Sequence, residues 1–313
     1  MKRKVANESM SALEENMNAA IQNRGAKSLS ALSRPLAPEE IAAYQEDGAT
    51  AIRGVVPLEW IERMGRAVDR ILAAPGRASV EYTPEGKPGR YYGDFFVWMR
   101  DPTFRAFAFE SPMPALAAQL MGSTRVSFFY DQLLVKEPGT LEPTPPHQDL
   151  PYWPLRGQDI MSIWVPFDPV RLDSGTVQYI QGSHRWGKMF APAPFGQNTG
   201  FQSIYEKAGL APMPPTEELT AGERVLSWEL DLGDVIVHHP LAIHFSDGNR
   251  SAGLRRRALA LRYLGDDACF DARPGTFMEN PKVRALFASD ELLRFEDGQP
   301  MINAAFPVVW PPS

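Results

Sequence analysis

Two residues separated by a single position, His147 and Asp149, are the first candidates for chemistry in this 313-residue sequence. In an extended segment, residues i and i+2 project from the same face. An imidazole and a carboxylate can therefore point at one site while Gln148 faces away. A third ligand can come from a distant strand, and His244, which follows residues 233–237, is the candidate. The sequence has five histidines, all between His147 and His244, which favours a shared site.

Two imidazoles and one carboxylate suit one face of an octahedral metal ion. This set is typical of non-haem Fe(II) oxygenases, in which three further positions stay open for cosubstrate and oxygen. Zinc also accepts His and Asp ligands, but hydrolytic zinc sites more often use a helical H-E-x-x-H pair, which is absent here. A His-x-Asp pattern is common by chance, so the prediction depends on the residues after His244.

A serine and a run of arginines follow His244, namely Ser246 and Arg255 to Arg257. A strand that carries an arginine into an apolar interior is costly unless the charge meets an anion. The planar guanidinium matches a carboxylate in shape and charge. An arginine and a serine near a metal-binding histidine therefore predict a site for a cosubstrate that bears a carboxylate.

Composition excludes several classes of protein. A content of 44% hydrophobic and 22% charged residues is typical of globular chains, and a net charge of -6 argues against a nucleic-acid partner. The single cysteine, Cys269, cannot form an internal disulfide framework. No apolar run approaches the ~18 residues of a membrane span. We expect a cytoplasmic protein with neither a membrane nor a nucleic-acid partner.

Predicted helices precede predicted strands along the chain. Helical patterns follow Pro38 and Pro57 and cover 104–121, whereas the short β-branched and aromatic segments begin at Val126. The expected strands are 49–56, 126–136, 160–167, 176–180, 234–238 and 257–264. This order predicts an α+β fold with a mainly β core, an antiparallel sandwich or barrel buttressed by N-terminal helices.

The predicted organisation is one domain with two appendages. Residues 1–34 are locally basic and carry one short amphipathic stripe, so we expect a helical or partly disordered extension. Residues 35–313 form the predicted single domain. Within it, residues 188–218 are long, rich in proline and glycine and weakly periodic, which is typical of a lid-like insertion.

Several separate segments together resemble the phytanoyl-CoA dioxygenase family of Fe(II)- and 2-oxoglutarate-dependent oxygenases. The resemblance covers roughly residues 36–263, and five or six segments in the same order are a strong signal where one alone is weak. The segments are Leu36–Ile41 with Glu46–Gly48, Leu133–Gly139, His147–Trp153, Ser162–Asp168, Ser174–Trp186 and His244–Tyr263.

The resemblance implies a double-stranded β-helix, or jelly roll, with His147, Asp149 and His244 as iron ligands. It also implies that Ser246 and one arginine hold the far carboxylate of 2-oxoglutarate. Counting forward from His244 gives Arg255, whereas aligning backward from the following strand gives Arg256, and we favour Arg256. Trp164 matches a family tryptophan beside the cosubstrate. Related halogenases replace the acid that is present here as Asp149, so halogenation is not expected.

The predicted activity is hydroxylation of a C–H bond in a small metabolite, with O2 consumed and succinate and CO2 released. Aromatic residues at 91–98 and 152–153 favour an apolar or ring-bearing substrate, although core packing also explains aromatics. Desaturation, epoxidation or rearrangement at the same iron centre is the alternative. A catalytically silent jelly-roll binding protein and a zinc hydrolase are less favoured. We expect a monomer or a homodimer.

Overall fold

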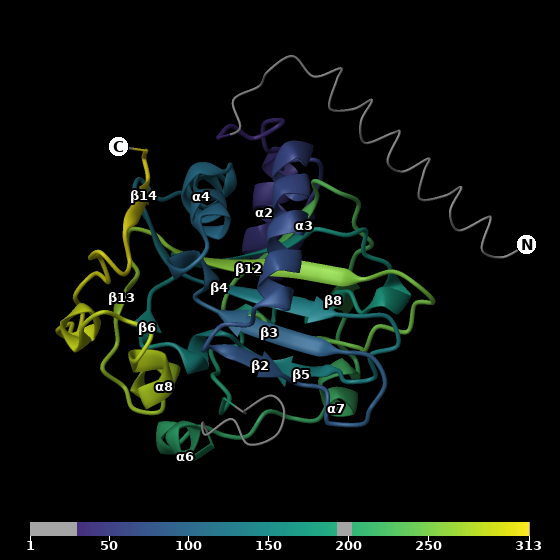
Figure 1. Cartoon of the computed structure of the whole chain (residues 1–313). Helices are drawn as coiled ribbons and strands as arrows, with labels where there is room; N and C mark the ends of the chain where they lie inside the picture. Colours follow the sequence, from purple (N-terminus) through teal and green to yellow (C-terminus); the bar gives the residue numbers. More distant parts are fainter. Residues whose placement is uncertain (1–29, 193–201, 313) are drawn as a thin grey trace, which may run out of the picture.

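The computed structural model describes residues 30–192 and 202–312, whose strands form two facing antiparallel sheets (Figure 1). The larger sheet has eight strands, in the order β1 (Ala49–Ile52), β10 (Val235–His238), β7 (Ile160–Pro166), β12 (Arg256–Leu264), β4 (Val126–Lys136), β3 (Tyr91–Phe95) and β2 (Ser79–Glu81), with β14 (Val308–Trp310) also beside β4. The smaller sheet has the order β5 (Thr144–His147), β11 (His244–Ser246), β8 (Val177–Ile180) and β9 (Val225–Ser227). β6 (Leu155–Arg156) and β13 (Cys269–Phe270) pair separately. The arrangement confirms the predicted mainly β jelly roll.

The strands of the larger sheet divide their side chains between two environments. On β7, Ile163 and Val165 pack into the main hydrophobic core, whereas Trp164 belongs to the cluster between the two sheets. On β12, Leu259 and Leu261 enter the main core, while the small residues Ala258 and Ala260 face the other way. Because successive side chains of a strand alternate, one face of the sheet supports the helices and the other faces the space between the sheets.

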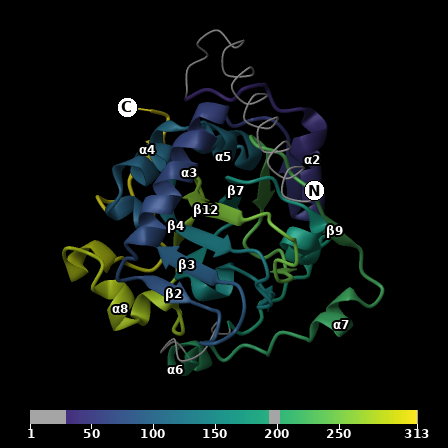
Figure 2. The same cartoon turned by 45° about the vertical axis from the view of Figure 1, so that its right-hand side comes forward.

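Helices α2 (Pro38–Asp47), α3 (Leu58–Ala73), α4 (Pro102–Glu110) and α5 (Met113–Met121) precede the long central strands. α3 buries Trp60, Ile61, Met64 and Val68 in the main core. Figures 1 and 2 both show α3 and α4 on the same side of β4 and β12. The predicted N-terminal helices therefore cover the outer face of the larger sheet.

Two predicted element boundaries are wrong. We expected one helix over 104–121, but α4 ends at Glu110 and α5 begins at Met113. Ser111 between them is extended, with ψ 175°, because the following Pro112 disfavours a helical conformation at the preceding residue. The strand expected over 49–56 ends at Ile52.

The later helices are short, and several contribute to the site described below. They are α6 (Gln202–Tyr205), α7 (Thr216–Thr220), α8 (Pro281–Arg284) and the 3-10 helices η1 (Val97–Met99), η2 (Leu150–Tyr152), η3 (Leu172–Ser174), η4 (Ser183–Arg185), η5 (Glu206–Ala208), η6 (Phe277–Glu279) and η7 (Asp290–Leu293). Most of the predicted extension, residues 1–29, and part of the predicted lid, 193–201, lie outside the described residues. Among the helices that are described, none is long and apolar enough to cross a membrane.

Candidate metal centre

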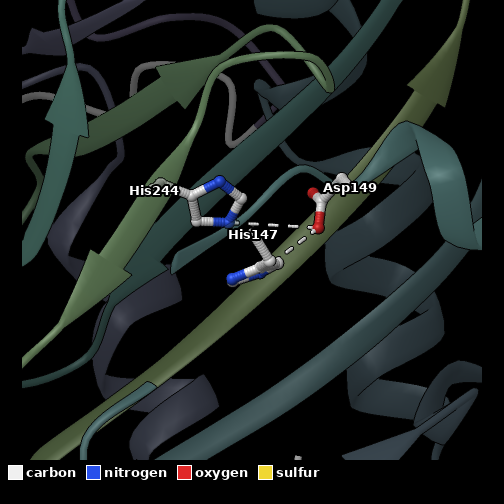
Figure 3. Close-up of side chains that lie close together, drawn as sticks. All are labelled: His147, Asp149 and His244. Atoms are coloured by element: carbon white, nitrogen blue, oxygen red, sulfur yellow. Dashed lines mark ion pairs between the residues drawn. The ribbon is translucent and has the colours of Figure 1, made fainter. Parts of the chain in front are cut away.

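The three residues predicted as metal ligands meet at the edge of the smaller sheet. His147 ends β5, His244 begins β11, and the two are paired across these neighbouring strands. Nε2 of His147 lies 3.8 Å from Asp149 Oδ1, and Nε2 of His244 lies 3.9 Å from the same oxygen. One candidate ligand atom from each residue falls within 4.8 Å of the others, and Figure 3 shows both rings directed at the carboxylate.

Asp149 lies at the predicted site, but its backbone conformation differs from the one that the sequence predicted. We expected an extended segment with His147 and Asp149 on one face, but β5 ends at His147. Asp149 has helical angles, φ -75° and ψ -43°, at the start of η2. Its backbone N–H donates to the carbonyl of Pro240 at 2.8 Å. Gln148 does face away, since its amide donates to the carbonyls of Lys188 and Leu241.

Backbone carbonyls orient both imidazoles for metal binding. Nδ1 of His147 lies 2.9 Å from the carbonyl of Pro145, and Nδ1 of His244 lies 3.0 Å from that of Ala242. A carbonyl only accepts hydrogen bonds, so each Nδ1 carries the proton and each Nε2 presents its lone pair toward Asp149. Burial lowers the pKa of His147, and burial with the neighbouring histidines lowers the pKa of His244 well below its usual value. Both rings are therefore neutral, as metal ligands must be.

The second oxygen of Asp149 is held by other side chains. Ser162 donates to Oδ2 at 2.8 Å, and Nε2 of His238 lies 3.2 Å from the same atom. The Tyr179 hydroxyl lies 3.1 Å from Nδ1 of His238. Since the carboxylate accepts, His238 donates from Nε2 and receives the Tyr179 O–H at Nδ1. These contacts leave Oδ1 as the oxygen that faces the two histidines.

The charge of Asp149 is stabilised although the residue is buried. Burial opposes ionisation, but the Arg262 guanidinium, the hydrogen bond from His238 and the nearby histidines outweigh it and hold the pKa of Asp149 well below its usual range. Sequence reasoning missed His238 and Arg262 at this site. His238 was recognised only as the end of a strand, and it is the pairing of β10 with β7, which places His238 opposite Ser162, that turns it toward Asp149.

The two candidate arginines occupy different environments. Arg255 lies in contact with solvent and forms ion pairs with Glu137 and Asp69. Arg256 is 2% exposed and lines a cavity, and its Nη1 donates to the carbonyl of Gly175. Nε and Nη2 of Arg256 are buried without a well-formed hydrogen bond to any described residue. Such an unsatisfied cation is suited to receive the carboxylate of a cosubstrate, which favours Arg256 over Arg255.

Other polar groups surround the Arg256 end of the cavity. Lys136 is fully buried opposite Arg256 in the sheet, and its ammonium donates to Ser246 Oγ at 3.0 Å. The Ser246 hydroxyl in turn donates to Thr144 Oγ1 at 3.1 Å. The Arg256 guanidinium lies 5.6 Å from the centre of the Trp164 ring. We name Lys136, Thr144, Trp164, Ser246 and Arg256 the polar end.

The cavity extends from the polar end past the three candidate ligands into a chamber of aromatic side chains. Its volume is about 410 Å³. Phe95, Phe96, Tyr152 and Trp153 line the cavity as predicted, whereas Trp98, predicted with them, packs in the core against Phe109 and Phe128. The side chains that we name the aromatic chamber are Phe95, Phe96, Tyr130, Tyr152, Trp153, Tyr205 and Phe277.

Comparison with known families decides the assignment. Residues 44–258 match the family model described as phytanoyl-CoA dioxygenase (PhyH), which is more than half of the chain. The chain belongs to the phytanoyl-CoA dioxygenase family. It is similar to a probable phytanoyl-CoA dioxygenase of Caenorhabditis elegans, with 24% identity over 256 residues that cover 75% of this chain and 77% of that protein.

Two solved structures share the fold of this family member. One is the non-haem alpha-ketoglutarate-dependent carbocyclase SnoK from nogalamycin biosynthesis, with a TM-score of 0.67, 20% identity and coverage of 91% of this chain and 99% of SnoK. The other is the epimerase SnoN in complex with Fe3+, alpha-ketoglutarate and nogalamycin RO, with a TM-score of 0.63, 21% identity and coverage of 87% and 97%.

The phytanoyl-CoA dioxygenase match covers most of the cavity lining. It includes the three candidate ligands, the whole polar end and six of the seven residues of the aromatic chamber, and it ends at Ala258. The lining residues beyond that point are Ala260, Arg262, Phe277, Lys282, Val283 and Leu286.

Proposed function

We propose that the chain is a non-haem Fe(II)- and 2-oxoglutarate-dependent dioxygenase that hydroxylates a C–H bond of a small, apolar or ring-bearing metabolite. The observation that carries the proposal is the convergence of Nε2 of His147, Nε2 of His244 and a carboxylate oxygen of Asp149 within 4.8 Å. This donor set suits Fe(II) and leaves coordination positions for a keto acid and O2. The binding of Fe3+ and alpha-ketoglutarate by the similarly folded SnoN supports it.

Bound iron would supply the activation of O2 at the cost of 2-oxoglutarate, with one oxygen atom going to succinate as CO2 leaves and the other to the substrate. The chain's own part is positioning. Arg256 and Ser246 would hold the far carboxylate of 2-oxoglutarate, and Nζ of Lys136, already hydrogen-bonded to Ser246, would add a further hydrogen-bond donor. With that carboxylate held in the polar end, the keto acid group would face His147, Asp149 and His244.

The aromatic chamber would receive the substrate on the other side of the candidate ligands. Flat apolar walls favour ring-bearing or apolar molecules and exclude water from the reacting bond. Tyr205, in the described part of the predicted lid, lines this chamber. We propose that residues 188–218 close over bound substrate, as expected of a long insertion at an active site.

The second candidate function is a different reaction at the same iron site. Desaturation, epoxidation or rearrangement differs from hydroxylation in the fate of the substrate after hydrogen abstraction. The similarly folded SnoK and SnoN are a carbocyclase and an epimerase. The complete set of candidate metal ligands disfavours a catalytically silent binding protein, which would not require it. The buried Arg256 disfavours a zinc hydrolase, which would not require an arginine for 2-oxoglutarate. A cytoplasmic location and a monomeric or homodimeric state remain predictions.

The test is an anaerobic titration of metal-free protein with Fe(II) and then 2-oxoglutarate. We expect the weak visible charge-transfer band of an iron-chelated keto acid, and we expect Asp149→Ala to lose it while keeping its fold. If folded, iron-loaded protein gives no band, the proposal is wrong. Products of turnover with candidate substrates then distinguish hydroxylation from the second candidate.

A further inference from the structure

Strand β12 directs two buried arginines into one cavity. Arg256 near its start, Ala260 and Arg262 all line the cavity, as expected for residues at even spacing on one face of a strand. At about 3.3 Å a residue, the backbones of Arg256 and Arg262 are roughly 20 Å apart. Arg256 belongs to the polar end, whereas Arg262 lies over the aromatic chamber. Its guanidinium is 4.7 Å from the centre of the Tyr130 ring and 5.9 Å from that of Trp153.

Arg262 is a cation with few partners. Its side chain is almost entirely buried, with the residue 3% exposed. Nη2 donates to Gln132 Oε1 at 2.8 Å and Nη1 donates to the carbonyl of Ala260 at 3.0 Å, both neutral acceptors. Nε is buried without a hydrogen-bond partner among the described residues. Among the residues that the structure describes, the acid within ion-pair distance is Asp149, whose Oδ2 is 3.9 Å away.

The charges that line the cavity do not balance once the proposed cofactors are assigned. Asp149 and the keto acid carboxylate of 2-oxoglutarate offset the charge of the metal dication, and the far carboxylate of 2-oxoglutarate offsets that of Arg256. Glu81, the other acid lining the described cavity, pairs with Arg90 at the surface. The remaining charged groups of the lining are Arg262 inside and Arg77 and Lys282 in exposed positions. Arg262 is therefore the buried cation of the lining whose charge no anion is left to offset, which is unfavourable, and ring faces compensate it only partly.

We propose that the substrate carries a carboxylate that Arg262 binds, with its ring-bearing part against Tyr130, Trp153 and Phe277. In this arrangement β12 supplies one arginine for the acid of the cosubstrate and a second for the acid of the substrate. The inference rests on the proposed function and deepens it by naming the class of substrate, an aromatic or polycyclic carboxylic acid. Arg262 lies four residues beyond the end of the family match at 44–258.

Matched acids and esters test the inference. The full chain is loaded without oxygen with Fe(II) and saturating 2-oxoglutarate, so that Arg256 is occupied. Binding of 2-naphthoate, anthracene-2-carboxylate and their methyl esters is then measured by calorimetry. We expect at least one acid to bind ten-fold or more tightly than its ester, and Arg262→Met to remove that preference while the affinity for the ester changes less than two-fold. Arg262→Lys, which keeps a cation, should retain part of the preference for the acid over its ester, and Arg255→Met should retain all of that preference.

The outcomes separate the two proposals. A wild-type protein without the charge-transfer band overturns the proposed function and this inference with it. A wild-type protein with the band that binds no acid more tightly than its ester overturns the inference alone. So does a preference for acids that survives in folded Arg262→Met, because Arg262 would then serve only to balance Asp149.

Discussion

The polar end and the aromatic chamber are built in different ways. The polar end consists of strand residues, and hydrogen bonds link several of them, as from Lys136 to Ser246 and from Ser246 to Thr144. The aromatic chamber gathers rings from β3, β4, η2, α6 and η6, which are joined by ring contacts, as between Tyr130 and Phe277 at 5.4 Å. Hydrogen bonds fix a small polar molecule by direction, whereas ring contacts accept many shapes.

The family match does not divide the two regions. The polar end lies wholly within residues 44–258, and so do six of the seven residues of the aromatic chamber, with Phe277 beyond the match. The two regions differ instead in what carries them, because the polar end lies on strands of the two sheets whereas Tyr152, Tyr205 and Phe277 lie on short helices. Substrate choice can therefore change through the residues on short helices while the cosubstrate site on the strands stays constant.

The largest effects should come from the candidate ligands, which serve both ends. His147→Ala and His244→Ala each remove one of three ligands, so we expect no measurable turnover and no charge-transfer band. Circular dichroism and melting temperature should stay close to wild type, because His147 sits at the cavity rather than in the main core. Full activity in either folded variant would remove the ligand assignment.

Arg256→Met should disable the polar end alone. Loss of charge-assisted hydrogen bonds, each worth about 1.5–3 kcal/mol, should raise the 2-oxoglutarate requirement by roughly 10- to 100-fold. Arg255→Met should change it less than three-fold, because Arg255 pairs with Glu137 and Asp69 at the surface. The measurement is the KM for 2-oxoglutarate, and the reverse order of effects would show that Arg255 is the cosubstrate ligand.

His238→Phe should weaken metal binding without altering the polar end or the aromatic chamber. The variant loses the N–H donor to Asp149 Oδ2 and the partner of Tyr179. Removing such an outer partner of a metal ligand typically costs 10- to 100-fold in metal affinity. Calorimetric titration with Co(II) measures the effect, and its visible spectrum reports the coordination. His238→Gln, which keeps a donor, should recover part of the affinity, and unchanged affinity in both variants would contradict the role.

Phe277→Ala should affect the chamber alone. The substitution removes a ring that contacts Phe96, Phe129 and Tyr130 and lines the cavity. We expect binding of 2-naphthoate to weaken by about 10-fold, as for the loss of roughly 1.4 kcal/mol of apolar contact, with the affinity for 2-oxoglutarate within two-fold of wild type. A larger effect on 2-oxoglutarate than on naphthoate would break the separation between the two ends.

Asp131→Asn should leave the polar end and the aromatic chamber unchanged and alter only the stability of the fold. Asp131 follows Tyr130 on β4 but accepts from the Trp98 backbone N–H, away from the cavity. Burial raises the pKa of Asp131 to about 7. The unfolded carboxyl ionises near pH 4 and the folded one only near 7, so ionisation disfavours the folded state increasingly across that interval. Asp131→Asn should therefore stabilise the protein more at pH 8, by up to about 4 kcal/mol, than at pH 4, as thermal or urea unfolding at the two pH values would show.

The sequence predicted the polar end better than the chamber because the resemblance to the family includes its residues. Aligning the family segment with the strand that follows favoured Arg256, and the i, i+2 spacing together with the resemblance predicted that His147, Asp149 and His244 meet. The pairing of β5 with β11 that brings the two histidines together is itself long-range. Asp149 also reaches the predicted point, although through a helical turn. His238 and Arg262 face Asp149 only because β10 and β12 flank β7, and neither pairing is visible in any one segment. The chamber needs residues 277–286 to fold back over β4, which no local pattern indicates.

The depth of the polar end has a kinetic consequence. Lys136, Ser246 and Arg256 are between 0% and 3% exposed, whereas the exposed residues of the same cavity, Arg77, Glu81 and Lys282, lie on β2 and its flank and on α8. A molecule seated in the chamber stands between that opening and the inner arginine. We therefore expect ordered addition, with 2-oxoglutarate entering before the substrate and succinate departing after the product. High substrate concentrations should then inhibit by trapping enzyme that lacks its cosubstrate, and added 2-oxoglutarate should relieve that inhibition.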